Sequence, residues 1–182
     1  TEKTDRTIFT VNPGMTFGTG THHTTRLCIE ELENIVDSQK TVLDLGCGSG
    51  ILSIISLLLG AKEAYAVDIA PACEHVAYDN ADMNGIDKNK YHVFSGDVIN
   101  DKHLLSTLDK RKYEVIVANI VADVIIAIIP TVKKLIKENG VFVCSGIIEE
   151  RIDDVTDALI KNGVKITHIK RSGEWAAIRC DF

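Results

Sequence analysis

Residues 42–54 read "VLDLGCGSGILSI". A short apolar run that meets three closely spaced glycines and then a second apolar run is typical of a buried strand, a tight turn and a helix. Glycines at such a turn let the backbone approach a ligand closely, and the N–H groups at the start of the helix face that ligand. The stretch therefore predicts the strand–turn–helix unit with which many α/β domains bind nucleotides.

Short β-like runs alternate with longer helical runs along the chain. We expect strands at 41–45, 64–69, 91–96, 113–119, 140–146, 164–171 and 176–182. We expect helices at 26–37, 50–59, 71–84, 102–110, 122–138 and 149–162. Strands that alternate with helices are joined by crossovers, so the sheet should be parallel and covered on both faces. This order predicts a three-layer α/β sandwich with a seven-stranded, mostly parallel sheet, to which the final hairpin adds an antiparallel edge strand.

Composition narrows the class of protein. The 182 residues are 45% apolar and carry a net charge of −6, with no basic stripe of the kind that binds nucleic acid. No apolar run approaches the length of a membrane span, and the five cysteines lack a C-x-x-C pair, so we expect reduced thiols and a cytoplasmic location. We expect an extended lead-in at 1–16 and one domain at 17–182. Because the chain opens on Thr1, we expect a processed chain or part of a longer one.

Two acids flank the glycine turn. Asp44 lies within the first strand, where it can accept a hydrogen bond from an ammonium group or from water. Asp68 ends the second strand, 22 residues beyond Gly46, where a carboxylate can bind both hydroxyls of a ribose. Gly46, Cys47 and Gly48 would border the same ligand. The alternative is that the glycines only turn the chain and the acids cap nearby helices.

Two further residues extend the predicted site toward a base. Ile69 follows Asp68 and would pack on one face of an adenine, and Asp97 would accept from the adenine amino group. Asp97 fits a helix N-cap equally well. A ribose-binding acid, an acid placed for an amino group and an acid at the adenine edge describe S-adenosylmethionine better than NAD, so we interpret the site as a methyl-donor site.

Asn119 ends the fourth strand at the edge where a methyl acceptor would arrive. Its amide oxygen can accept from an attacking amine and orient the lone pair. Ile120, Val121 and Ala122 follow, without the aromatic residue that stacks on a flipped base, and this argues against a DNA or RNA acceptor. The alternative role of Asn119 is to satisfy backbone groups at the strand end.

The loop at 17–25, "FGTGTHHTT", should cross the same edge of the sheet. His22 is followed directly by a second histidine and no third ligand stands at a metal spacing, so we predict no metal site. No lysine follows Gly20 as a phosphate-binding loop requires. The interpretation that remains is a lid over the methyl donor. Phe17 would exclude water from the donor, and Thr24 and Thr25, at a helix start, would face the donor carboxylate. His22 is a candidate general base, and an ordinary capped loop is the alternative.

Five segments together resemble the PrmA family, whose members methylate ribosomal protein L11: "NPGMTFGTGTHHTT", "VLDLGCGSGILSI", "VDIAPACEHVAYDNADMNG", "VANIVAD" and "GEWAAI". The resemblance runs from about residue 12 to residue 178. It implies a class I methyltransferase fold, S-adenosylmethionine as donor, and methylation of lysine side chains and an N-terminal amine. Its cofactor positions correspond to Thr25, Gly46, Asp68 and Asn119.

The chain also departs from the family pattern. The family usually has His-Pro where this chain has His22 and His23, and Asp-Pro where it has Asn12 and Pro13. Family members carry an N-terminal domain that recruits the ribosomal protein, and we expect that domain to be absent from residues 1–182. A free-standing methyltransferase with a small-molecule or other protein acceptor is therefore an alternative. An NAD-type oxidoreductase and a non-catalytic cofactor-binding module are less favoured.

Overall fold

The computed structural model of the chain describes residues 8–11 and 22–182. Seven strands form one sheet: β1 (Thr41–Leu45), β2 (Glu63–Asp68), β3 (Tyr91–Ser95), β4 (Tyr113–Asn119), β5 (Ile136–Ile148), β6 (Lys165–Ser172) and β7 (Trp175–Asp181). Six α-helices accompany them: α1 (His23–Ile35), α2 (Ile51–Leu58), α3 (Ala72–Met83), α4 (Lys102–Leu108), α5 (Ala122–Leu135) and α6 (Ile152–Lys161). Two short 3-10 helices, η1 (Lys88–Lys90) and η2 (Glu149–Arg151), complete the described part.

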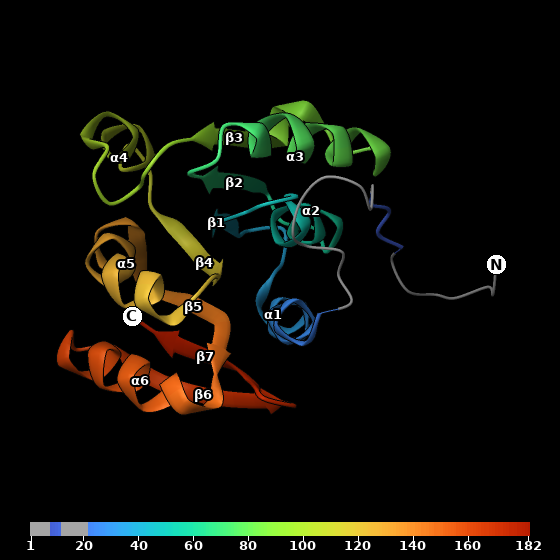
Figure 1. Ribbon diagram of the computed structural model, residues 1–182. Helices are drawn as coiled ribbons and strands as arrows, with labels where there is room; N and C mark the ends of the chain where they lie inside the picture. The colour runs from blue at the N-terminus through green and yellow to red at the C-terminus, as the bar shows by residue number, and fades with distance from the viewer. Residues whose placement is uncertain (1–7, 12–21) are drawn as a thin grey trace.

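The sheet is the middle of three layers, as the sequence predicts. Helices α1, α2 and α3 cover one face, and α4, α5 and α6 cover the other (Figure 1). The central strands are buried on both faces, which explains why runs such as "YEVIVAN" in β4 are almost continuously apolar. The larger apolar core lies on the α5 and α6 side, and two smaller clusters lie under α1, α2 and α3.

Strand order in the sheet is β3-β2-β1-β4-β5-β7-β6. The chain order reverses between β1 and β4, and a ligand in such a sheet binds outside the carboxyl ends of the strands at that reversal. Strand β7 is antiparallel to both of its neighbours, β5 and β6. The predicted final hairpin is confirmed, and its antiparallel strand lies one position inside the edge. The first residue of β7 consequently reaches the same rim as the last residues of β1, β4 and β5.

Several element boundaries differ from the sequence-based prediction, among them the starts of α1 and β5. Helix α1 begins at His23 rather than 26, because the ring of His22 accepts a hydrogen bond from the backbone N–H of Thr24 and caps the helix. Strand β5 begins at Ile136 rather than 140, so α5 ends three residues before the predicted 138. A helix-like apolar spacing and a strand cannot be told apart over so short a run.

Of the predicted lead-in at 1–16, only residues 8–11 lie within the described chain. The backbone of Thr10 pairs with the side-chain amide of Asn84 at the end of α3: its N–H donates to Oδ1 at 2.8 Å and its carbonyl accepts from Nδ2 at 2.6 Å. Phe9 packs against the clusters under α2 and α3. Among the described helices, none is long and apolar enough to cross a membrane. All five cysteines are free and buried.

Candidate functional site

The turn after β1 is built from glycines in a left-handed backbone conformation. Gly46, Gly48 and Gly50 have φ values of 76°, 52° and 78°. A Cβ on Gly46 would lie 2.4 Å from the Cγ2 methyl of Ile120, so glycine is needed there for space as well as for conformation. The backbone N–H of Gly46 donates to the carbonyl of Val67 at 2.8 Å, which joins the turn to the end of β2. The turn is therefore held tightly beneath the rim.

Asp44 is the most deeply buried acid at this rim, with only 1% of its surface exposed. Its Oδ2 accepts from the backbone N–H of Ser53 at 3.0 Å, whereas its Oδ1 has no hydrogen-bond partner within the described part of the chain. Burial raises the pKa of this carboxyl to about 7, opposed by the hydrogen bonds from Ser53. A buried oxygen that receives no hydrogen bond lowers the stability of the fold. This oxygen is therefore suited to accept a hydrogen bond from a cationic group of a ligand.

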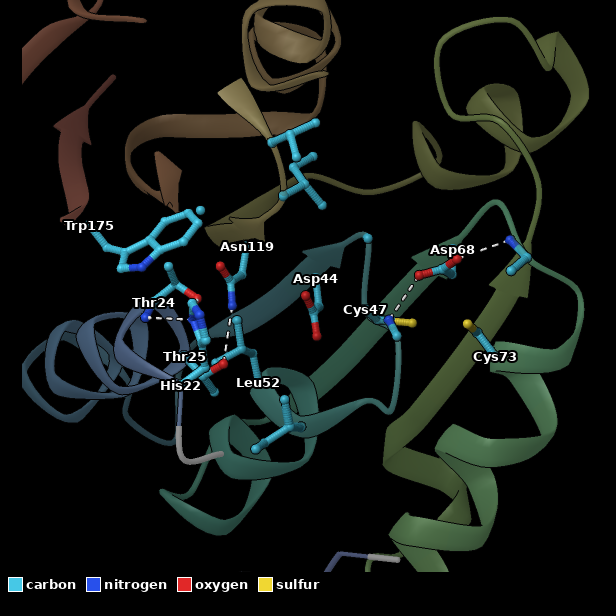
Figure 2. Close-up of a pocket in the computed structure, with 17 residues that line it drawn as sticks. His22, Thr24, Thr25, Asp44, Cys47, Leu52, Asp68, Cys73, Asn119 and Trp175 are labelled. Carbon is cyan, nitrogen blue, oxygen red and sulfur yellow. Dashed lines mark hydrogen bonds between the residues drawn. The ribbon is translucent and has the colours of Figure 1, made fainter. Parts of the chain in front are cut away.

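Asp68 stands on the other side of the glycine turn. Its Oδ2 accepts from the N–H of Gly48 at 2.8 Å and its Oδ1 from the N–H of Ala70 at 2.9 Å. Figure 2 shows the carboxylate of Asp68 and the side chain of Asp44 facing the same space from neighbouring strands. Each oxygen of Asp68 keeps acceptor capacity beyond its one backbone donor, so the carboxylate can also receive two vicinal hydroxyls.

Two adjoining cavities of about 640 and 490 Å³ open at the reversal of strand order. Gly46, Asp68, Ile120 and Val121 line both of them. The larger one is also lined by predicted residues His22, Thr24, Thr25, Asp44, Cys47, Gly48 and Asn119. The smaller one is lined by the two residues predicted to contact a base, Ile69 and Asp97. The predicted site residues among the described chain thus converge on one bilobed cavity.

The smaller cavity has a largely apolar lining that includes Val67, Ile69 and Val98. Ile69 is 71% exposed, which leaves its apolar side chain free to cover a flat ring. Asp97 bonds within its own loop: its Oδ1 accepts from the N–H of Ile99 at 2.9 Å and its Oδ2 from the side-chain amide of Asn100 at 2.7 Å. These bonds, led by that of Asn100, lower the pKa of Asp97. The N-cap of α4 is Asp101 rather than Asp97, so the alternative role predicted for Asp97 is wrong.

The larger cavity brings Asn119 together with the start of α1. The amide Nδ2 of Asn119 donates to Oγ1 of Thr25 at 3.2 Å, and both side chains face the cavity (Figure 2). Nδ1 of His22 lies 2.9 Å from Oγ1 of Thr24, and the ring of His22 meets that of Trp175 edge-on with centroids 5.0 Å apart. A polar pair and an aromatic wall therefore stand on the side of the cavity opposite Asp68.

Several lining residues were missed by the sequence-based prediction. In the larger cavity they are Ile51, Leu52, Ala70, Cys73, Ile120, Val121, Gly146 and Trp175. Trp175 is the notable case, because its motif carries the family resemblance but its role depends on the antiparallel course of β7. Of the predicted lid at 17–25, residues 17–21, which include Phe17, lie outside the described residues. Within the described chain, no group of three or more histidine, cysteine, aspartate or glutamate side chains can hold a metal ion.

This sheet order, with a glycine turn between two carboxylates at the rim, is that of a class I methyltransferase domain. An RNA methyltransferase from Salinibacter ruber, solved in complex with S-adenosyl-L-homocysteine, shares the fold with a TM-score of 0.63 over 84% of this chain and 86% of its own, at 17% identity. A ribosomal protein L11 methylase from Lactobacillus delbrueckii subsp. bulgaricus is more similar, with a TM-score of 0.83 and 32% identity over 93% of this chain and 82% of its own.

Residues 1–181 match the family model described as ribosomal protein L11 methyltransferase (PrmA), and the chain belongs to that family. The family member from Agathobacter rectalis is 41% identical over 97% of this chain and 56% of its own length. That from Thermoanaerobacter pseudethanolicus is 44% identical over 94% of this chain and 52% of its own. The predicted family is confirmed, and the chain spans about half the length of these relatives.

Proposed function

We propose that this chain transfers a methyl group from S-adenosylmethionine to amines of ribosomal protein L11, namely lysine side chains and the N-terminal amine. The observation that carries the proposal is the cavity that runs from Asp68 to Asn119 past Oδ1 of Asp44, an oxygen with no hydrogen-bond partner among residues 8–11 and 22–182. Family membership supports the choice of acceptor, because the relatives are named for methylation of L11. Such an acceptor implies a cytoplasmic site of action.

The residues present fit the proposed donor. Asp68 would hold the ribose hydroxyls, and Asp44 the ammonium of the methionine part, which would supply a hydrogen bond to an oxygen that receives none from the described residues. Ile69 and Asp97 border the space for the adenine. The N–H groups and hydroxyls in the first turn of α1, including Thr25, would meet the donor carboxylate. An NAD-type ligand has no ammonium for Asp44, and this favours the methyl donor over the oxidoreductase alternative.

Chemically, S-adenosylmethionine supplies a methyl group already activated on a sulfonium. The protein must deliver a neutral amine, and an exposed lysine with a pKa near 10.4 is neutral in only about one molecule in a thousand at neutral pH. The apolar lining by Leu52, Ile120, Val121 and Trp175 disfavours the charged form of the amine. The amide oxygen of Asn119 would accept one amine hydrogen and orient the lone pair, which places the reactants in line. His22 lines the same cavity and is the candidate to receive the proton.

The direct test is a methyl-transfer assay with purified L11 and labelled S-adenosylmethionine. We expect label on L11, and less label on an L11 variant whose lysines are replaced by arginine. A thermal-shift series with S-adenosylhomocysteine and NAD separates the classes of cofactor, because a ligand that binds only the folded state raises the melting temperature. Stabilisation by NAD alone would contradict the proposal, whereas binding of S-adenosylhomocysteine without transfer to any amine would favour the non-catalytic module.

A further inference from the structure

Glu31 is a charged residue in the interior, at a place that the proposed chemistry does not use. It lies on the buried face of α1, and its side chain is only 4% exposed. We propose that Glu31 is a positioning residue: it clamps α1 onto the β6–β7 hairpin and so fixes the wall of the cavity formed by the first residues of α1 and β7. The inference rests on the proposed function only in so far as that wall borders the methyl-donor site.

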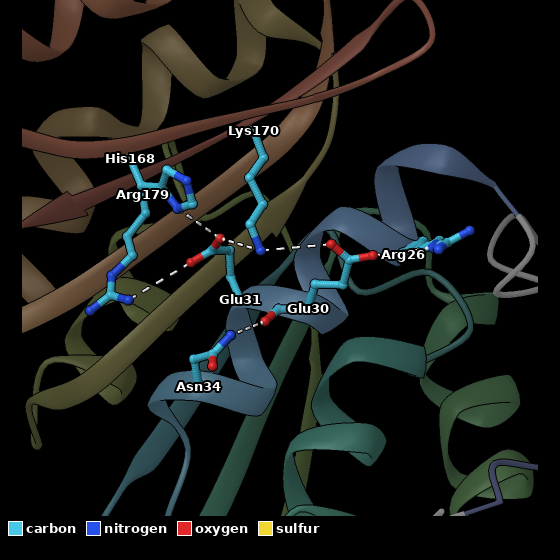
Figure 3. A network of polar contacts seen from close by, with 7 residues as sticks. All are labelled: Arg26, Glu30, Glu31, Asn34, His168, Lys170 and Arg179. Carbon is cyan, nitrogen blue, oxygen red and sulfur yellow. Dashed lines mark hydrogen bonds and ion pairs between the residues drawn. The ribbon is translucent and has the colours of Figure 1, made fainter.

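Two cations, Lys170 and Arg179, and the ring of His168 converge from the hairpin on this one carboxylate (Figure 3). Nζ of Lys170 lies 2.9 Å from Oε1 of Glu31, Nδ1 of His168 lies 3.2 Å from the same oxygen, and Nη1 of Arg179 lies 3.8 Å from Oε2. The hydrogen bond to Glu31 is the largest influence that raises the pKa of Lys170. Buried carboxylates are rarely kept without such partners, so the pairing determines where the hairpin lies against the helix.

The adjacent Glu30 provides a natural comparison. It is also acidic and also faces Lys170, at 3.6 Å, but its side chain is 39% exposed and it pairs mainly with Arg26 at 3.2 Å. Exposed pairs contribute little to holding two elements together, because water and salt screen them. Comparing variants of the two neighbouring glutamates therefore separates the effect of losing the Glu31 clamp from the effect of removing one negative charge from α1.

The clamp lies two helical turns from the cavity. At its other end α1 presents Thr25, which is bonded to Asn119, and β7 begins at Trp175, against which the cap residue His22 packs. A second tie joins the same elements near the rim, since Nδ1 of His23 lies 2.7 Å from Oγ of Ser172. Helix and hairpin thus meet at the cavity wall, and the ion pairs of the buried Glu31 hold them together farther along.

Removal of the charge on Glu31 leaves Lys170 and Arg179 without their buried anion, and we expect the hairpin to move away from the helix. Trp175 reports this movement directly, because it is the only tryptophan among the 182 residues. In Glu31→Gln we expect red-shifted tryptophan emission, stronger quenching by acrylamide, and about tenfold weaker binding of S-adenosylhomocysteine. In the matched control Glu30→Gln we expect all three to match the parent protein.

A second substitution that restores donor binding distinguishes a positioning role of Glu31 from a role in overall stability alone. Removing the principal cation as well, in Glu31→Gln with Lys170→Met, should return the emission maximum and the affinity toward those of the parent protein. If Glu31→Gln does not fold, Lys170→Met and Arg179→Met examine the same clamp from the hairpin side. A lowered melting temperature with unchanged emission and affinity, or equal effects of the two glutamate variants, would overturn the proposal. If the parent protein binds no S-adenosylhomocysteine, the proposed function fails, while tryptophan emission still tests the clamp.

Discussion

The carboxylate of Asp68 accepts a hydrogen bond of 2.8 Å from the backbone N–H of Gly48, a residue 20 positions earlier in the chain. A second bond, from the N–H of Ala70, holds its other oxygen. The acid at the end of β2 and the glycine turn after β1 are therefore fixed relative to each other before any ligand arrives. Such preorganisation lowers the entropy that binding must overcome.

Replacement of Asp68 should weaken binding of S-adenosylhomocysteine strongly. We expect Asp68→Ala to lose about 1.5–3 kcal/mol of binding free energy, the worth of hydrogen bonds to a charged acceptor. Isothermal titration calorimetry measures this directly. Asp87→Ala removes an exposed acid that only caps η1, and it should leave the affinity unchanged. Equal affinities of Asp68→Ala and the parent protein would exclude the ribose role.

Asn119 should matter more for turnover than for donor binding. In Asn119→Ala we expect turnover with L11 to fall at least about a hundredfold, because the acceptor amine loses its orienting group. Affinity for S-adenosylhomocysteine should change much less, since Thr25 loses only one neutral hydrogen bond. Steady-state kinetics and calorimetry on the same variant separate the two effects. A loss confined to donor affinity would mean that Asn119 serves the donor and not the acceptor.

Proton uptake at Asp44 should make donor binding depend on pH. In the free protein burial raises the pKa of this carboxyl to about 7. The ligand's ammonium favours the ionised form, so binding lowers that pKa and releases a proton. Affinity for S-adenosylhomocysteine should therefore fall, by up to about tenfold per pH unit, as the pH drops below 7. Calorimetry in buffers of different ionisation enthalpy counts the proton, and Asp44→Asn should bind weakly with no such dependence.

The same shift affects the stability of the ligand-free protein in a defined direction. The folded state binds the proton of Asp44 more tightly than the unfolded chain does, because the pKa is raised from 3.8 to about 7. This contribution to stability is complete below the unfolded pKa and is lost as the pH rises through the folded one. Urea unfolding across that window should show a smaller loss of stability with rising pH in Asp44→Asn than in the parent protein.

Gly46 and Gly163 allow two effects of an added Cβ to be measured separately: the cost of a left-handed backbone and the cost of a steric clash. Their φ values are nearly equal, at 76° and 74°, but a Cβ on Gly163 meets no atom within 4 Å, whereas one on Gly46 would collide with Ile120. Both alanine variants should be destabilised by about 1 kcal/mol through backbone conformation. Gly46→Ala should lose a further 1–3 kcal/mol or so from overpacking, together with donor binding. Equal unfolding free energies of Gly46→Ala and Gly163→Ala would show that the side chain of Ile120 can move aside without loss of stability.

The positions of the glycine turn, Asp44 and Asp68 at the rim could be predicted because they depend on residues close in sequence to strand ends. Trp175 could not, since its place at the cavity depends on β7 running antiparallel between β5 and β6. The clamp at Glu31 was equally hidden, because its partners lie more than 130 residues away and a lone glutamate on a helix normally faces solvent. The place of Trp175 and the partners of Glu31 both depend on pairing between distant parts of the chain and not on a local sequence pattern.

The capping role of His22 shows that local sequence patterns can also misplace the start of a helix. Histidine is not among the residues that usually begin a helix, so the pattern placed the start of α1 three residues late. Likewise the strand β5 extends four residues into a stretch that the apolar spacing assigned in part to a helix. The roles of Cys47, Ile69, Asp97 and His22 in ligand contact stay predictions, although all four border the bilobed cavity.

Ile120 lies between two glycines: its methyl group approaches Gly46, and its backbone carbonyl would lie 2.4 Å from a Cβ on Gly146. Because its side chain borders both lobes, any change of size there alters the room for the nucleoside and the room for the incoming amine at once. Redesign toward bulkier acceptors should therefore start at Trp175, which borders the larger lobe alone, so that the lobe lined by Ile69 and Asp97 is left unchanged.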